Sequence, residues 1–271
     1  MFLVWPGVVI MRDGNAARLA LVGETLLEYR PSKDDCVVAK VSSGLSSVAI
    51  ETMLPVRESP QWQGKTYYEG VYWSSTARGH IRYESFLERE YLISADMDLE
   101  ITAMQWQPFI LTWPRGTRGH RDHVPDYFCR LASGDGLVVD VKWVGGVERS
   151  ARQFDMTREV CTQIGWHYEI FTGLPEPRRA NTLFLSGFRQ DRYQPSADLE
   201  PLIAEVCATP TTIADALNKL RWMTKASPDV IKGNLFHEMW RGAVSVNLDA
   251  PLDEHTVLTA PSLPRARVVS P

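Results

Sequence analysis

The feature that most constrains the fold is a run of alternating predicted elements between residues 80 and 172. YESFLEREYLIS has the apolar spacing of an amphipathic helix. Three segments typical of strands follow: ITAMQWQPFILTW, HVPDYFCRLA and LVVDVKWV, the last two joined by a Ser-Gly-Asp-Gly turn. VERSARQFDMTREVCTQIG then predicts a helix ending at Gly165, and HYEIFT predicts a strand. This order predicts a mixed α/β layer with a helix for each face of its sheet.

Two further parts flank this run. Residues 19–50 mix short apolar segments with turn formers, which indicates short strands. After a Pro- and Arg-rich stretch at 174–180, three helical segments (ADLEPLIAEVCA, TTIADALNKLRWM, SPDVIKGNLFHEMWRG) precede a two-stranded ribbon, the order of a winged helix. We therefore expect an N-terminal segment of unassigned role over residues 1–55, a mixed α/β domain over 56–179, and a mostly helical winged-helix-like domain with a tail over 180–271.

Composition narrows the classes of function. The chain has 271 residues, of which 44% are hydrophobic, and a formal net charge of -4, which excludes a globally basic nucleic-acid coat but permits a local basic groove. The cysteines, Cys36, Cys129, Cys161 and Cys207, form no CxxC pair, so neither a disulfide framework nor a zinc ribbon is indicated. No stretch approaches the roughly 18 uncharged apolar residues of a membrane span. We expect a cytoplasmic protein with no membrane partner.

The apolar start of the chain, MFLVWPGVVIM, does not have the pattern of a secretion signal. It lacks a basic beginning, contains Pro6, and is followed by Arg12 and Asp13 instead of a small-residue cleavage site. Our hypothesis is that translation naturally starts at Met11.

The densest chemical signal is Pro125-Asp126 followed by Asp140-Val141-Lys142. Residues two apart on a strand face the same side, so Asp140 and Lys142 project together, and the intervening hairpin can bring Asp126 beside them. Two carboxylates suit a hard cation such as Mg²⁺, and a nearby lysine can orient a water or neutralise charge at phosphorus. Glu88 on the preceding helix can supply a further carboxylate. These residues suit hydrolysis of a phosphodiester, although an Asp-x-Lys strand can also be a plain surface ion pair.

Other residues have weaker readings. Glu84 and Glu90 are interpreted as solvated helix charges, and Trp106, Trp113 and Trp143 as core or sheet-face aromatics. The spacing of His120 and His123 is a weak metal signal. We list as candidate DNA contacts Gln107, Arg115, Arg118 and Arg121, the arginines lying in a loop that can equally be only solvated. On the last helix Lys232, His237 and Arg241 could meet DNA or merely pack, and the acidic ribbon turn with Asp249, Asp253 and Glu254 favours a protein partner.

From about residue 60 to 172 the sequence resembles the catalytic domain of TnsA-type transposase endonuclease subunits, of the PD-(D/E)xK restriction-endonuclease-like superfamily. The matching pieces are Ser85-Phe86-Leu87-Glu88, Gln107-Pro108-Phe109, Pro125-Asp126-Tyr127-Phe128 and Asp140-Val141-Lys142. The resemblance implies catalytic roles for Glu88, Asp126 and Lys142. One departure is Asp140, since the family often has Gln two residues before the lysine, so metal affinity or metal number can differ here.

The resemblance also implies fold, activity and partners. It implies a restriction-endonuclease-like core, a mixed sheet flanked by helices, followed by a winged-helix-like domain. It implies an Mg²⁺-dependent (alternatively Mn²⁺-dependent) endodeoxyribonuclease that cuts DNA at transposon ends. From the residue pattern we expect Glu88, Asp126 and Asp140 to bind the Mg²⁺. The implied partners are a TnsB-like DDE transposase and a TnsC-like AAA+ ATPase. Two alternatives stay open: a stand-alone restriction-like or junction-resolving nuclease, and a non-catalytic DNA- or partner-binding module of the same fold.

Overall fold

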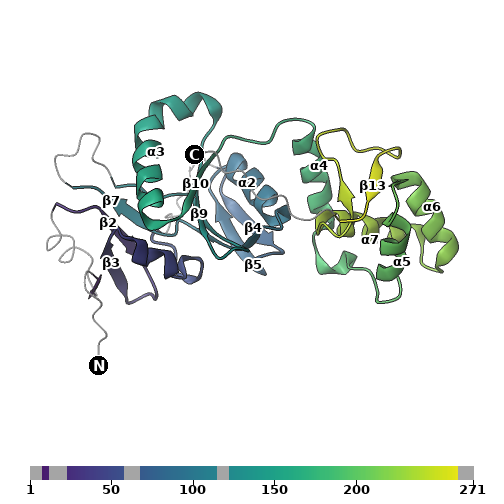
Figure 1. Ribbon diagram of the computed structural model, residues 1–271, viewed down its shortest axis with the longest axis horizontal. Helices are drawn as coiled ribbons and strands as arrows, with labels where there is room; N and C mark the ends of the chain where they lie inside the picture. Colours follow the sequence, from purple (N-terminus) through teal and green to yellow (C-terminus); the bar gives the residue numbers. More distant parts are fainter. Residues whose placement is uncertain (1–7, 12–22, 58–67, 115–121, 262–271) are drawn as a thin grey trace. The chain divides into compact units, whose positions relative to one another are not determined.

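The computed structural model describes residues 8–11, 23–57, 68–114 and 122–261 (Figure 1). Within these ranges the chain is a mixed α/β protein with six α-helices and several small sheets. It divides into two compact units. The first contains the described residues of Met1–Arg89 and Ile101–Thr172, and the second those of Glu90–Glu100 and Gly173–Arg267. None of the helices in the described ranges is long and apolar enough to cross a membrane.

The main sheet of the first unit has the strand order β10-β9-β8-β6. Its strands are β6 (Ile101–Trp106), β8 (Tyr127–Leu131), β9 (Gly136–Val141) and β10 (His167–Phe171). β8 pairs antiparallel with β6 and with β9, whereas β10 runs parallel to β9 because α3 (Val144–Ile164) connects them. Gly134, with φ +91°, makes the β8–β9 turn, and Gly165, with φ +94°, caps α3. The predicted mixed α/β arrangement is confirmed here.

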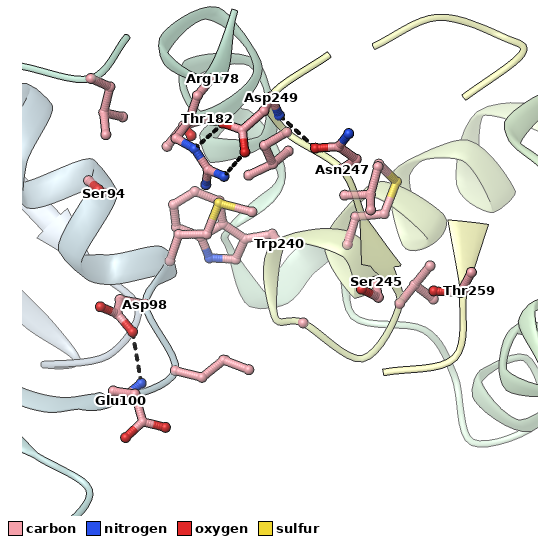
Figure 2. A pocket seen from close by; sticks show the side chains of 18 of the residues that line it. Ser94, Asp98, Glu100, Arg178, Thr182, Trp240, Ser245, Asn247, Asp249 and Thr259 are labelled. Atoms are coloured by element: carbon pink, nitrogen blue, oxygen red, sulfur yellow. Dashed lines mark hydrogen bonds and ion pairs between the residues drawn. The ribbon is translucent and has the colours of Figure 1, made fainter. Parts of the chain in front are cut away.

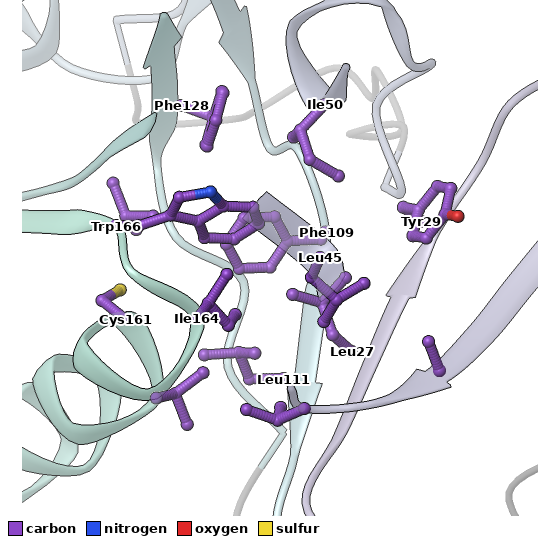
Figure 3. Close-up of a cluster of buried hydrophobic side chains, with 14 of the residues drawn as sticks. Leu27, Tyr29, Leu45, Ile50, Phe109, Leu111, Phe128, Cys161, Ile164 and Trp166 are labelled. Carbon is purple, nitrogen blue, oxygen red and sulfur yellow. The ribbon is translucent and has the colours of Figure 1, made fainter. Parts of the chain in front are cut away.

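A second sheet, β1-β3-β2-β7, joins the beginning of the chain to the same unit. Its strands are all antiparallel: β1 (Val8–Met11), β2 (Leu26–Tyr29), β3 (Cys36–Lys40) and β7 (Ile110–Thr112). Two short 3₁₀ helices follow β3, η1 (Ser43–Ser47) and η2 (Ile50–Thr52). Leu27, Leu45 and Ile50 share one buried cluster with Phe128, Ile164 and Trp166 (Figure 3). Residues 26–50 therefore help to form the core of this unit and are not a separate segment.

The single strand expected over ITAMQWQPFILTW is two strands in different sheets. Gln107 lies between β6 and β7 with φ +43°, a left-handed conformation that no regular strand contains, and Pro108 after it lacks an amide hydrogen. The remaining elements of the unit are a hairpin of β4 (Gly70–Ser74) and β5 (Gly79–Tyr83), and the first turn of α2 (Phe86–Met97). From Glu90 onward α2 belongs to the second unit.

The second unit begins near Gly173, earlier than the expected residue 180, and includes the end of α2. Its α-helices are α4 (Arg178–Leu185), α5 (Glu200–Cys207), α6 (Ile213–Met223) and α7 (Pro228–Trp240), with 3₁₀ helices η3 (Ser186–Phe188) and η4 (Asp191–Tyr193). The predicted ribbon gains a strand, because β11 (Thr211–Thr212) pairs with β13 (Val257–Thr259), which also pairs with β12 (Ser245–Val246). Thr212 and Ser227 cap α6 and α7 with their hydroxyls, which accept from the backbone N–H groups of Asp215 and Val230.

Candidate active site

The four predicted catalytic residues all belong to the first unit. Asp126 directly precedes β8, Asp140 lies near the end of β9, Lys142 follows β9, and Glu88 is in the first turn of α2. The carboxylate of Asp126 accepts a hydrogen bond of 2.7 Å from the backbone N–H of Val141. The hairpin therefore holds Asp126 against the end of β9, between the positions of Asp140 and Lys142, as the sequence predicted.

Electrostatics shows that the carboxylates of this region influence one another. Burial raises the pKa of Asp126 well above its usual value, and the negative charges of Asp140, Glu88 and Glu84 raise it further, against the Val141 hydrogen bond. The pKa of Glu88 is raised by burial and by Glu84, although hydrogen bonds from Glu84 and Ser85 oppose the change. The largest electrostatic influences on Asp126 thus come from other acids, an arrangement typical of functional sites.

Glu88 also has a structural role. The Oγ of Ser85 accepts a hydrogen bond of 3.1 Å from the Glu88 N–H and donates one of 2.9 Å to its carboxylate, while the Glu84 N–H donates to the same carboxylate at 2.7 Å. This is a capping box at the start of α2. The hydroxyl of Tyr127 lies 3.4 Å from Glu88. The Ser-x-x-Glu motif consequently fixes the carboxylate in one orientation and starts the helix.

Asp140 is 3% exposed, and two side chains hold one of its oxygens. Tyr168 on β10 donates to Oδ2 at 2.5 Å, and Nε2 of His123 lies 3.0 Å from the same atom. Burial and the charge of Asp140 raise the pKa of Tyr168, so the phenol stays a donor. Sequence reasoning missed both partners, since neither the weak His spacing nor the strand containing Tyr168 carries a recognisable motif.

Gln107 and Glu84 extend the carboxylate cluster. Gln107 is 5% exposed; its backbone N–H donates to the carbonyl of Asp126 at 2.9 Å, and Nε2 donates to Glu84 at 3.2 Å. Its Oε1 is buried without a hydrogen-bond partner among the described residues. The predicted DNA contact of Gln107 stays a prediction. Glu84, which also lies 3.6 Å from Arg57, is part of the cluster and not the solvated charge expected.

Several other predictions are corrected by burial. Glu90 is buried and bound to Arg179, so it is not a solvated charge. Trp113 is buried as expected, whereas Trp143 is 57% exposed. His237 is buried, and its Nδ1–H donates to the carbonyl of Phe188 at 2.7 Å, so it cannot meet DNA. His120 and the candidate DNA contacts Arg115, Arg118 and Arg121 lie outside the described residues.

A cavity of about 720 Å³ in the second unit is a separate feature (Figure 2). Arg178, at its wall, donates two hydrogen bonds to the carboxylate of Asp249, of 2.7 and 2.6 Å, and this lowers the pKa of Asp249. Trp240 lies between this pair and Asp98, which directly follows α2 (Figure 2). None of the predicted catalytic residues lines this cavity, and its charged pair is an ordinary compensated ion pair.

The candidate site suits a hard divalent cation in the type of donor that it offers. Carboxylate oxygens of Glu88, Asp126 and Asp140 and the unpartnered amide oxygen of Gln107 are the ligand atoms that Mg²⁺ and Mn²⁺ accept. Within the described ranges, no three His, Cys, Asp or Glu side chains already converge as a metal-binding cluster. The residues therefore fit a divalent cation by the type of their donor atoms and by their negative charge.

Comparison with known proteins adds no further assignment. No protein-family model matches the chain, and no curated protein matches it.

Proposed function

We propose that the first unit is a metal-dependent DNA endonuclease of the PD-(D/E)xK kind. The observation that carries this proposal is the position of Asp126, which is held at the end of the β8–β9 hairpin by Val141 and surrounded by the charges of Asp140 and Glu88. A protein that only needed a stable fold would gain by replacing such mutually repelling buried carboxylates. A divalent cation would compensate their charges.

The residues would divide the chemistry among them. Glu88, Asp126 and Asp140 would hold a divalent cation, which when bound supplies Lewis acidity toward the phosphate and a more acidic water. Tyr168 and His123 both contact Oδ2 of Asp140 and so orient its carboxylate. Lys142 directly follows β9 in the sequence and would orient the attacking water or neutralise charge on the phosphate oxygens.

The architecture supports a finer assignment within the same proposal. Antiparallel β6, β8 and β9 with a parallel β10 reached through α3 is compatible with a restriction-endonuclease-like core. In the second unit, a helix, a strand, two helices and a ribbon with sheet order β11-β13-β12 is compatible with a winged-helix-like domain. We propose that the chain is the TnsA-like subunit of a heteromeric transposase, acting on transposon ends with TnsB-like and TnsC-like partners.

The second unit would bind protein partners and would not read the DNA sequence. A winged helix reads DNA by placing its last helix in the major groove. Here that helix is α7, and residues 233–240 are all buried. Arg241, which follows α7, is paired with Glu200 at 2.9 Å. These features support a role in recruiting the transposase or the ATPase. The alternatives remain a stand-alone nuclease and a non-catalytic module.

A nicking assay tests the proposed function. Full-length protein would be incubated with supercoiled plasmid bearing candidate transposon ends, with and without Mg²⁺ and a TnsB-like transposase. We expect nicking at the ends that requires Mg²⁺, and loss of nicking with Asp126→Asn. Nicking by the chain alone would favour the stand-alone nuclease. Absence of nicking under every condition, with wild-type DNA binding intact, would favour the non-catalytic module.

A further inference from the structure

Trp143 is the residue directly after the candidate catalytic lysine, and it is exposed to solvent although it is large and apolar. It precedes α3 with an extended backbone. A Cβ placed on Gly145 would lie 1.9 Å from Cζ3 of Trp143, and one on Gly146 would lie 2.8 Å from its Nε1. The indole therefore lies directly on the backbone of the first turn of α3. Glycine at both positions is what allows this, so the ring is held in place while much of it faces solvent.

The surroundings of Trp143 are cationic. The guanidinium of Arg149 lies 5.3 Å from the centre of the ring, within the range of a cation–π contact. Lys142 shares the same surface, because a Cβ on Gly146 would lie 3.2 Å from its Cε. The first turn of α3 contains no acidic residue, and no side chain caps it. An aromatic ring between Lys142 and Arg149 beside an uncapped helix start suits a phosphate-bearing ligand with an aromatic base.

A second exposed aromatic pair lies next to Glu88 in the sequence. Tyr68 and Phe86 stack with ring centres 4.7 Å apart and are 69% and 60% exposed. Phe86 is two residues before Glu88, on the first turn of α2. Thus Glu88 and Lys142 of the candidate site each lie within two residues of an exposed aromatic residue, Phe86 and Trp143 respectively.

We propose that Trp143, supported by Gly145 and Gly146 and flanked by Lys142 and Arg149, stacks on an unpaired nucleobase. The substrate of the candidate nuclease would then be DNA that is single-stranded or locally opened at the cleaved nucleotide, with the Tyr68–Phe86 pair as a second stacking surface. This inference rests on the proposed function for the role of the stacked nucleotide in cleavage. Binding of the unpaired base does not require cleavage, so it can be tested separately.

The test measures binding of the full-length chain to labelled oligothymidylate of about 20 nucleotides and to a duplex of the same length, by fluorescence anisotropy in EDTA. We expect Trp143→Ala to weaken single-strand binding by roughly 5- to 150-fold, the range for loss of one stacked base, and to change duplex binding far less. Val144→Ala, at an adjacent residue that is 72% exposed, is the matched control and should bind both like wild type.

Two further variants keep the test independent of folding. Trp143→Phe keeps an aromatic ring and should retain most of the single-strand affinity. Gly145→Ala keeps the indole but forces it from its place, so it should lose affinity as Trp143→Ala does, with an unchanged circular dichroism spectrum. Wild-type single-strand affinity in Trp143→Ala, an equal loss for single strand and duplex, or no single-strand binding by any form would overturn the inference.

Failure of the proposed function would look different. Asp126→Asn should bind the single strand like wild type even if it cannot cut. If wild type never nicks DNA but Trp143→Ala still loses single-strand binding, the nuclease proposal fails and the stacking inference stands. If wild type nicks DNA normally and Trp143→Ala binds the single strand like wild type, the nuclease proposal stands and the stacking inference fails.

Discussion

The two units of this protein differ in the charged groups that surround their buried carboxylates. In the second unit, the buried carboxylate of Glu90 accepts hydrogen bonds from Nε of Arg179 at 2.6 Å and from the Leu174 N–H at 2.8 Å. In the first unit, burial raises the pKa of Asp126, and the charged groups that raise it further are other carboxylates, those of Asp140, Glu88 and Glu84. A buried acid with an arginine is part of the structure, whereas one among other acids indicates a site that expects a cation.

The largest expected effect comes from Asp126→Asn. The amide can still accept the Val141 hydrogen bond but cannot serve as an anionic ligand, so we expect Mg²⁺-dependent nicking to fall by at least about 100-fold. Removal of a repelled charge should leave thermal stability in EDTA equal to or higher than wild type. Nicking assays and thermal unfolding measure the two quantities. Lys142→Ala should lose nicking similarly, and its retention of wild-type turnover at saturating Mg²⁺ would refute the role of the lysine.

Asp126→Asn should change how the stability of the chain depends on pH. The pKa values of Asp126 and Glu88 are raised in the folded state, so between about pH 4, where carboxyls ordinarily titrate, and the raised values, the folded chain binds more protons than the unfolded one. The free energy of unfolding in EDTA should therefore fall as pH rises through that window. The stability of Asp126→Asn relative to wild type should grow with pH, which urea unfolding at several pH values would measure. A difference that is constant with pH would contradict the raised pKa of Asp126.

Breaking the compensated pair should have the opposite sign. Arg179→Ala leaves the buried carboxylate of Glu90 with the Leu174 N–H but without its cation. Because Arg179 is itself about half exposed, we expect a loss of about 1 to 2 kcal/mol, less than for a fully buried pair. Urea unfolding at neutral pH measures it. Arg179→Lys should recover part of the loss, and single-strand DNA binding should not change. A stabilising effect would remove the contrast between the units.

The smallest expected effect is that of Tyr168→Phe. It removes one of the two hydrogen bonds to Asp140 while the aromatic ring stays in place. Because the carboxylate loses part of its orientation, we expect the Mg²⁺ concentration for half-maximal nicking to rise several-fold, roughly as the loss of one hydrogen bond to a charged group implies. The rate at saturating Mg²⁺ should fall less. A lowered rate with unchanged Mg²⁺ dependence would show that Tyr168 acts otherwise.

Local chemistry explains which parts could be predicted from the sequence. The β8–β9 hairpin and the end of α3 follow from alternating apolar residues and from Gly134 and Gly165 at positions of positive φ. The hairpin was enough to predict that Asp126 lies beside the end of β9. The break at Gln107 was missed, because its left-handed backbone depends on the packing around it and not on a turn motif.

Long-range pairing explains the parts that could not be predicted. Arg179 and Glu90 are 89 residues apart, and Tyr168 and Asp140 are 28 apart, so no periodicity or short motif joins them. The same holds for the N-terminal sheet, whose partner β7 follows β2 by about 80 residues and is identified only by register. Glu90 was predicted to be a solvated charge and is buried, and Trp143 was predicted to be a core or sheet-face aromatic and is exposed.

Titration with Mn²⁺ measures whether the carboxylates around Asp126 bind a divalent cation. The electron paramagnetic resonance signal of free Mn²⁺ falls as the ion binds. Wild type, Asp126→Asn and Glu90→Gln would be compared at about pH 7.5, where an ordinary carboxyl is ionised. We expect wild type and Glu90→Gln to bind Mn²⁺ alike and Asp126→Asn to lose this binding. Equal binding by wild type and Asp126→Asn, or no binding by wild type with or without DNA, would contradict this expectation.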